Sequence, residues 1–145
     1  MTILHHIRTL LQSFPQIAAV MGTVHVEFAD SNPDSYGLAS IGDSLQREDI
    51  LGNQVRKHDF LLYMTYSGIN DYERLHNSEA LLALCQWLPE QIGGTVESRL
   101  GGRICTGTVT KIAADNGMLY AVPQENCMDG LRYQMQITVT YTVTN

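Results

Sequence analysis

The fold is decided by the segment Leu131-Arg-Tyr-Gln-Met-Gln-Ile-Thr-Val-Thr-Tyr-Thr-Val143. Its apolar side chains occupy every second position, and polar side chains occupy the positions between them. A period of two predicts an extended strand with one buried side and one side in water. At about 3.4 Å per residue this strand would span roughly 44 Å, more than twice the length of an ordinary strand. We therefore expect part of it to pair or pack outside the core of a small domain, as in an assembly subunit.

Size and composition indicate a single globular domain, or one domain with an arm, over residues 1–145. The net charge is −6, from nine basic and fifteen acidic residues, which argues against tight binding to nucleic acid. No apolar run approaches the roughly 18 residues of a membrane span, and the first residues lack the pattern of a signal peptide. The cysteines Cys85, Cys105 and Cys127 are widely spaced, which predicts free thiols in a reducing compartment.

The apolar spacing before the last strand predicts both helices and strands. An amphipathic helix is expected at residues 3–14, ended by Pro15. A second helix is expected from Asn70 or Asp71, and Pro89 should bend or end it. Strands are expected at residues 23–28, 36–39, 55–66, 106–113 and 118–122.

The connections between these elements follow from their turn residues. Residues 40–52 read as a polar link, and the glycine pairs 93–94 and 101–102 bracket a flexible loop. Asn116-Gly117 is a strong hairpin signal between two short strands. The order predicts an α+β fold, with a largely antiparallel sheet that has a long C-terminal strand and is flanked by an N-terminal and a central helix.

Side chains that could carry out catalysis or bind a metal are scattered along the chain. The sequence has neither a Gly-x-Ser-x-Gly elbow nor a phosphate-binding glycine loop. A ligand-binding module would require a deep pocket lined by convergent polar groups, for which His25, His58 and Asp59 are candidates. The two histidines, both expected on exposed strand faces, meet only if their strands pair. We therefore predict no catalytic residues, no metal ligands and no cofactor.

Several segments in a fixed order resemble one protein family. They are Tyr36-Gly-Leu38, Gly42-Asp43, Asp49-Ile-Leu-Gly52, Phe60-Leu-Leu-Tyr-Met64, Asn77-Ser-Glu-Ala-Leu-Leu-Ala-Leu-Cys-Gln-Trp-Leu-Pro-Glu-Gln91 and Leu131-Arg-Tyr-Gln-Met-Gln-Ile-Thr-Val-Thr-Tyr141. Together they are similar to the small tail-terminator proteins, often labelled minor capsid proteins, of tailed bacteriophages and prophages of Gram-positive bacteria. The resemblance covers residues 36–143.

The resemblance implies a structural virion protein that is not an enzyme. Copies of such a protein form a ring, usually of six, on the head-proximal end of the tail tube, where they stop tube polymerisation and join the head connector. The partners implied are further copies, the tube protein, the sheath protein if the tail contracts, and the connector. DNA would pass through the lumen without specific binding, and assembly would take place in the bacterial cytoplasm. Two alternatives stay open: a tail-tube or neck-adaptor subunit, and a small enzyme or ligand-binding module.

Two places are expected to contact other subunits. The first is the outward face of the last strand, with Arg132, Gln134, Gln136 and Thr138. The second is the loop at residues 93–103, which carries Arg99 and Arg103.

Overall fold

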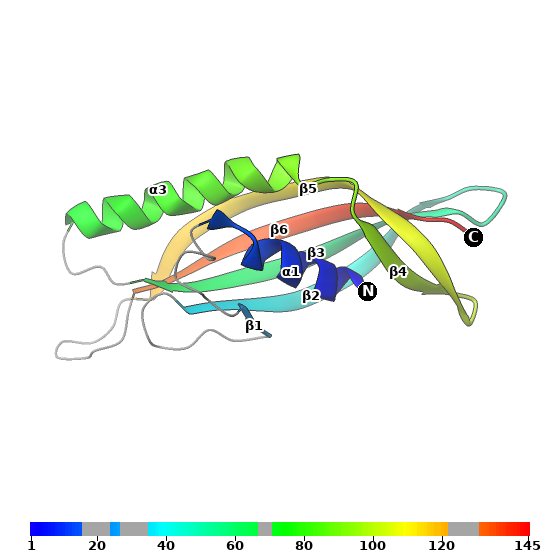
Figure 1. Cartoon of the computed structure of the whole chain (residues 1–145), viewed down its shortest axis with the longest axis horizontal. Helices are drawn as coiled ribbons and strands as arrows, with labels where there is room; N and C mark the ends of the chain where they lie inside the picture. The colour runs from blue at the N-terminus through cyan, green and yellow to red at the C-terminus, as the bar shows by residue number, and fades with distance from the viewer. Residues whose placement is uncertain (16–23, 27–34, 67–70, 122–130) are drawn as a thin grey trace.

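The structure is a computed structural model that describes residues 1–15, 24–26, 35–66, 71–121 and 131–145. Within these residues a six-stranded sheet has the order β1-β2-β3-β6-β5-β4 (Figure 1). Strand β1 runs parallel to β2, and every other neighbouring pair is antiparallel. The predicted α+β fold is confirmed. Its elements are α1 (Ile3–Gln12), β1 (Val24–Val26), β2 (Ser35–Glu48), β3 (Gln54–Tyr66), α3 (Asp71–Trp87), the 3-10 helix η1 (Leu88–Glu90), β4 (Thr95–Leu100), β5 (Arg103–Ala121) and β6 (Leu131–Val143).

Strand β6 has the predicted bounds and lies in the interior of the sheet. It pairs with β3 along its whole length, from Leu131 opposite Tyr66 to Val143 opposite Gln54. Its other edge pairs with β5. The expectation that part of β6 pairs or packs outside its own domain is therefore wrong. Strands β3 and β5, of 13 and 19 residues, are long enough to pair with it inside the same chain.

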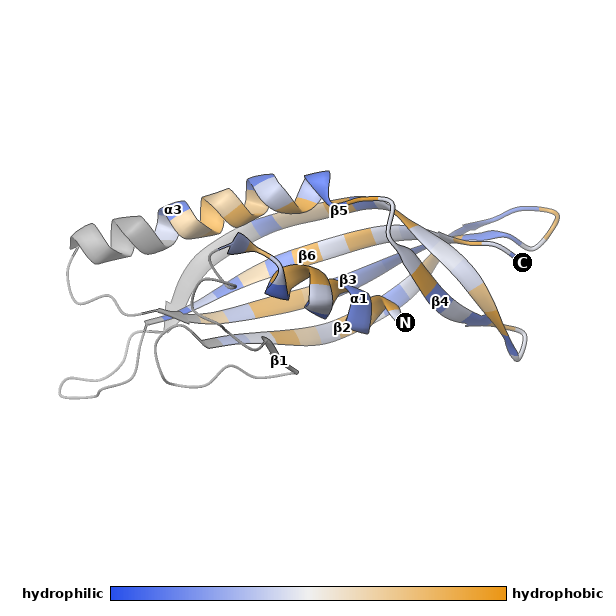
Figure 2. Ribbon diagram, in the orientation of Figure 1, coloured by the Kyte–Doolittle hydropathy of each residue, from blue (hydrophilic) through white to orange (hydrophobic). Residues whose placement is uncertain are grey.

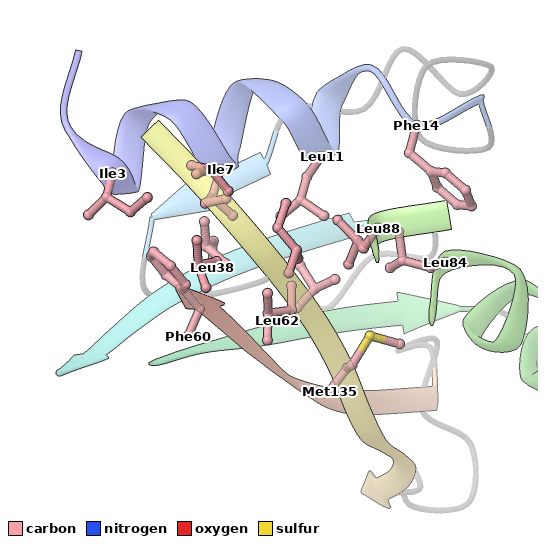
Figure 3. Packing of buried hydrophobic residues seen from close by; sticks show 14 of the residues in the cluster. Ile3, Ile7, Leu11, Phe14, Leu38, Phe60, Leu62, Leu84, Leu88 and Met135 are labelled. Carbon is pink, nitrogen blue, oxygen red and sulfur yellow. The ribbon is translucent and has the colours of Figure 1, made fainter. Parts of the chain in front are cut away.

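The hydrophobic core lies on one face of the sheet, beneath α1 and α3. Figure 3 shows Ile7 and Leu11 of α1 pointing toward the sheet, with Ile7 above Leu38 and with Leu88 beside Leu11. Each fully buried side chain of this size contributes about 1.5–3 kcal/mol of hydrophobic stabilisation. The fully buried apolar side chains include Ile7, Leu11, Leu38, Phe60, Leu62, Met64, Leu88, Met135 and Ile137.

Both predicted helices end close to the prolines that were expected to stop them. Helix α1 ends at Gln12, three residues before Pro15. Helix α3 ends at Trp87, and Pro89 lies within the following 3-10 turn. The aromatic rings of Phe14 and Trp87, whose centroids are 5.1 Å apart, pack together where the two helices end.

Two expected connections are strands in the structure. Residues 40–48, expected as a polar link, continue β2 as the partner of β3. The expected loop at 93–103 contains β4, which forms a hairpin with β5. Gly101 and Gly102 form its two-residue turn, with φ angles of 55° and 85°. Positive φ at both positions is the geometry that matches the twist of a hairpin, and glycine adopts it without strain.

The predicted hairpin at Asn116-Gly117 is also wrong, because β5 runs through both residues. The register against β6 shifts there, so that Asp115 lies opposite Gln136 and Met118 lies opposite Gln134. One extra residue on β5 is accommodated as a β-bulge. Of the strand expected at 23–28, β1 confirms residues 24–26. The rest of that strand lies outside the described residues. So does Val122, the last residue of the strand expected at 118–122, and so does Cys127.

Strand β5 lies close to the backbone of β6 at Gly107, which suggests a test of the packing. A Cβ added to Gly107 would lie 2.4 Å from the carbonyl oxygen of Thr142. We expect Gly107→Ala to destabilise the fold by about 1–3 kcal/mol because the backbones must separate. The matched control is Gly42→Ala, where nothing lies within 4 Å of the added carbon. Urea unfolding of both variants measures the difference, and equal stabilities would contradict the described packing.

Candidate functional site

Two β-hairpins project beyond the helices at one end of the molecule (Figure 1). One joins β4 to β5. The other joins β2 to β3, and we call its residues 41–57 the arm. Ile50 and Leu51, at the tip of the arm, are 101% and 73% exposed. Figure 2 shows this tip as an orange, apolar patch at the end of a mostly polar hairpin. Exposed apolar side chains at the end of a projection are a common feature of binding surfaces.

The tip of the arm is held in one conformation by the carboxylate of Asp49. Its Oδ1 accepts hydrogen bonds from the backbone N–H groups of Leu51 and Asn53, each at 2.9 Å. Its Oδ2 accepts a third bond, at 3.0 Å, from the side-chain amide of Asn53. The hydrogen bonds from Asn53 lower the pKa of Asp49. Gly52 supplies the left-handed conformation that the turn requires, with φ at +86°. The two apolar side chains are therefore presented by a preorganised turn.

Asn145 connects the arm to the other hairpin. Its backbone N–H donates to Asn53 Oδ1 at 2.8 Å, and its side-chain amide donates to the carbonyl oxygen of Leu51 at 2.9 Å. The guanidinium of Arg103, from the β4–β5 hairpin, donates to Asn145 Oδ1. The two hairpins are thus linked through one residue.

A polar cluster lies at the base of the arm, on the same face of the sheet as the core. A register shift between Ser40 and Gly42 places an extra residue in β2. Because side chains alternate along a strand, this bulge brings Ser40 and Asp43 to the same face although they are three residues apart. Strand β3 contributes Arg56 and His58, which continue the row of buried residues that begins at Phe60.

The carboxylate of Asp43 is the centre of this group, which we call the Asp43 cluster. Its Oδ1 accepts from Arg56 Nε at 2.6 Å, and its Oδ2 lies 2.9 Å from His58 Nδ1. The hydroxyl of Tyr141, from β6, donates to the same Oδ2. On the other side of the imidazole, His58 Nε2 lies 2.6 Å from Ser40 Oγ. One carboxylate thus joins three neighbouring strands.

The surroundings of Asp43 and Tyr141 change their proton affinities. Burial alone would raise the pKa of Asp43, but hydrogen bonds from Tyr141, Arg56 and His58 outweigh it and hold this pKa below its usual value. Burial, together with the bond to Asp43, raises the pKa of Tyr141 to about 12. At neutral pH the cluster therefore contains a carboxylate and a neutral phenol.

The contacts among Ser40, His58 and Asp43 match the order of a hydrolytic triad. Nucleophilic catalysis also requires oxyanion donors and a cavity for the substrate. A hollow of about 360 Å³ lies beside the arm, but Ser40 and His58 are not among its lining residues. Asp43 also bonds Arg56 and Tyr141, so its charge is shared across three strands. This arrangement favours a role in fixing the base of the arm. The hollow is lined by Arg47, Asp49, Asn53, Gln54, Val55, Thr142, Val143 and Thr144.

The residues proposed for a ligand-binding module are not brought together as a site. His58 belongs to the Asp43 cluster and is buried, so the expectation that it lies on an exposed face is wrong. Asp59 follows it on the opposite face of β3, where its Oδ1 accepts from Thr138 Oγ1 at 3.0 Å. Strand β1 pairs with β2 rather than with β3, and the side chain of His25 lies outside the description.

The residues expected at a subunit interface fall into two separate groups. The side chains of Arg132, Gln134, Gln136 and Thr138 are half-buried on the face of the sheet away from the core. No helix in the described part of the chain covers that face (Figure 1). Arg99 and Arg103 are exposed beside the turn of the β4–β5 hairpin. The groups lie toward opposite ends of β5, because Arg132 is opposite Ala121 whereas Arg103 begins the strand.

Sequence reasoning allowed for an arm but did not place it at residues 41–57, and it missed the Asp43 cluster. The cluster had a signal, since Arg56 and His58 lie at period-two positions from the apolar residues of β3. Polar residues in a buried row predict a partnered polar group. The sequence also contained a signal for the tip of the arm, because Asp49 and Gly52 are typical turn residues.

Comparisons with known proteins found no match for this chain: no protein-family model matches it, and no curated protein matches it. In the described residues, no group of three or more histidine, cysteine or acidic side chains is arranged to hold a metal ion. No helix among them is both long and apolar enough to cross a membrane.

The Asp43 cluster predicts a pH-dependent contribution to stability. We expect Asp43→Asn to lower the free energy of unfolding at neutral pH by about 1–2 kcal/mol, because Arg56 loses its charged partner. The folded pKa of Asp43 is lowered, so this contribution is present above its unfolded value of about 3.9 and is lost as the pH falls below it. Chemical unfolding at several pH values measures the effect. The exposed Glu48→Gln is the control on the same strand, and a loss independent of pH would contradict the role of the charge.

Proposed function

We propose that this chain is a structural tail-terminator subunit of a bacteriophage or a phage-like tail. Copies form a ring, of six in the simplest case, on the head-proximal end of the tail tube. The ring stops tube polymerisation, contacts the head connector, and also contacts the sheath protein if the tail contracts. Assembly takes place in the bacterial cytoplasm, and the protein performs no catalysis. The sequence resemblance over residues 36–143 supports the family, and the projecting hairpins support an assembly role.

The observation that carries the proposal is the distribution of exposed apolar side chains. Among the described residues, five of the eight large exposed hydrophobics lie on the two hairpins. A subunit of a closed ring needs two different surfaces, each complementary to the other. The projecting hairpins at one end and the exposed apolar residues elsewhere are the two candidate surfaces. The five residues are Ile41, Leu45, Ile50, Leu51 and Ile104.

The charge of the chain is consistent with a ring through which DNA passes. Each copy carries −6, and proteins that grip the DNA backbone gain affinity from positive charge. A lumen formed by acidic subunits would therefore not hold the genome.

The most direct test of this function is the oligomeric state with and without the tube protein. Native mass spectrometry at high protein concentration should show a closed oligomer, and addition of the tube protein should increase its population. Electron microscopy should then show rings at one end of short tubes. Open-ended filaments of this chain alone would contradict a terminator and favour the tube subunit. A monomer under all these conditions would contradict any ring.

The tip of the arm supplies a second test. Replacing both apolar residues, as Ile50→Ser with Leu51→Ser, should leave thermal stability nearly unchanged because both side chains are exposed. Co-assembly with the tube protein should fall at least about tenfold, as expected when a buried hot spot is removed. Lys111→Glu, an exposed change on β5 away from the tip, is the control. Normal co-assembly of the double variant would remove the tip from the contact surface.

A further inference from the structure

The tip of the β4–β5 hairpin has a distinct chemical character. Arg99 and Arg103 flank its glycine turn, and Ile104 beside them is 65% exposed. Residues 98–104 contain no acidic residue. Arg99 lies opposite Ile104, so these two side chains share one face of the hairpin, whereas Arg103 lies opposite Leu100 on the other face. The three exposed side chains together surround the end of the hairpin, which we call the basic tip.

A second surface on the same chain has the opposite character. Glu79, Leu82 and Gln86 are exposed at helical spacing on α3, and the exposed stripe continues onto Glu90 and Ile92 beyond it. Leu82 is 57% exposed and Ile92 is 55% exposed. Residues 78–92 contain two acidic residues and no basic one. We call this surface the acidic stripe.

We propose that the basic tip of one copy docks on the acidic stripe of the next copy. This inference rests on the proposed ring and names the two surfaces that would close it. Opposite charges around apolar side chains orient a contact and exclude wrong partners. A tip-to-tip contact would bring four arginines together and is disfavoured. Figure 1 shows α3 and the tip on different sides of the molecule, so the contact joins different copies head to tail, as a ring requires.

Charge reversal with rescue tests the pairing. The tip variant combines Arg99→Glu with Arg103→Glu, and the stripe variant combines Glu79→Arg with Glu90→Arg. We expect each to weaken ring formation at least about tenfold, because like charges then face one another. The variant with all four changes should recover ring formation to within about threefold of the unchanged chain, because the opposite charges are restored. Lys111→Glu, a reversal outside both surfaces, should have little effect.

Sedimentation velocity over a range of protein concentrations measures the assembly, and thermal melting of dilute samples checks that each variant is folded. Arg103 also bonds Asn145, so Arg99→Glu alone serves as a second tip variant that leaves this bond in place. If both reversal variants form rings as well as the unchanged chain does, the docking is overturned but the proposed ring is not. The same holds if the four-change variant forms rings no better than the two variants it combines. An unchanged chain that stays monomeric with the tube protein present would overturn the ring and the docking together.

Discussion

The pairing of β6 along both edges is the constraint on which the rest of the structure depends. Because β3 and β5 match its length, no edge of this strand is left for another chain. The alternation of its side chains then divides the sheet into two faces. One face is apolar and is covered by α1 and α3, and the other is rich in threonine and glutamine. Any contact with another subunit must therefore use surfaces other than the edges of β6.

The same pairing explains how the hairpins can project. Strands β2 and β3 continue past the covered core, where apolar packing no longer holds them together. The Asp43 cluster replaces it with hydrogen bonds and an ion pair that join β2, β3 and β6. Beyond this cluster, Asp49 orders the tip of the arm. The chain thus extends a hydrogen-bonded projection from a small core, and this projection exposes Ile50 and Leu51 at its tip.

Much of the fold could be predicted where one side of an element is buried. The period-two pattern predicted the bounds of β6, and the helical period predicted α1 to within two residues at its end. The pattern failed for the second half of β2, because a strand in water on both faces has no apolar alternation. Asn116-Gly117 indicated a turn, but the long β6 offered continuous pairing and the residues became a bulge. Local turn preference was outweighed by tertiary pairing.

The candidate surfaces could be predicted only in part. Arg99 and Arg103 are exposed near a hairpin turn, which the glycine pairs could have indicated. Arg132 to Thr138 lie on the helix-free face, and their role in assembly stays a prediction. The position of Asp43 depends on a one-residue bulge, and the sequence carries no periodic signal for such a shift.

Hydrogen exchange on the dilute monomer and on the proposed ring tests most directly the proposal that this protein acts by shape through its projections. The amides of β3 and β6 should be protected in both states because their bonds are internal. Added protection on assembly should fall on the hairpin turns and the end of α3. Assembly that protects only the middle of the sheet, or leaves both hairpins unchanged, would contradict the claim.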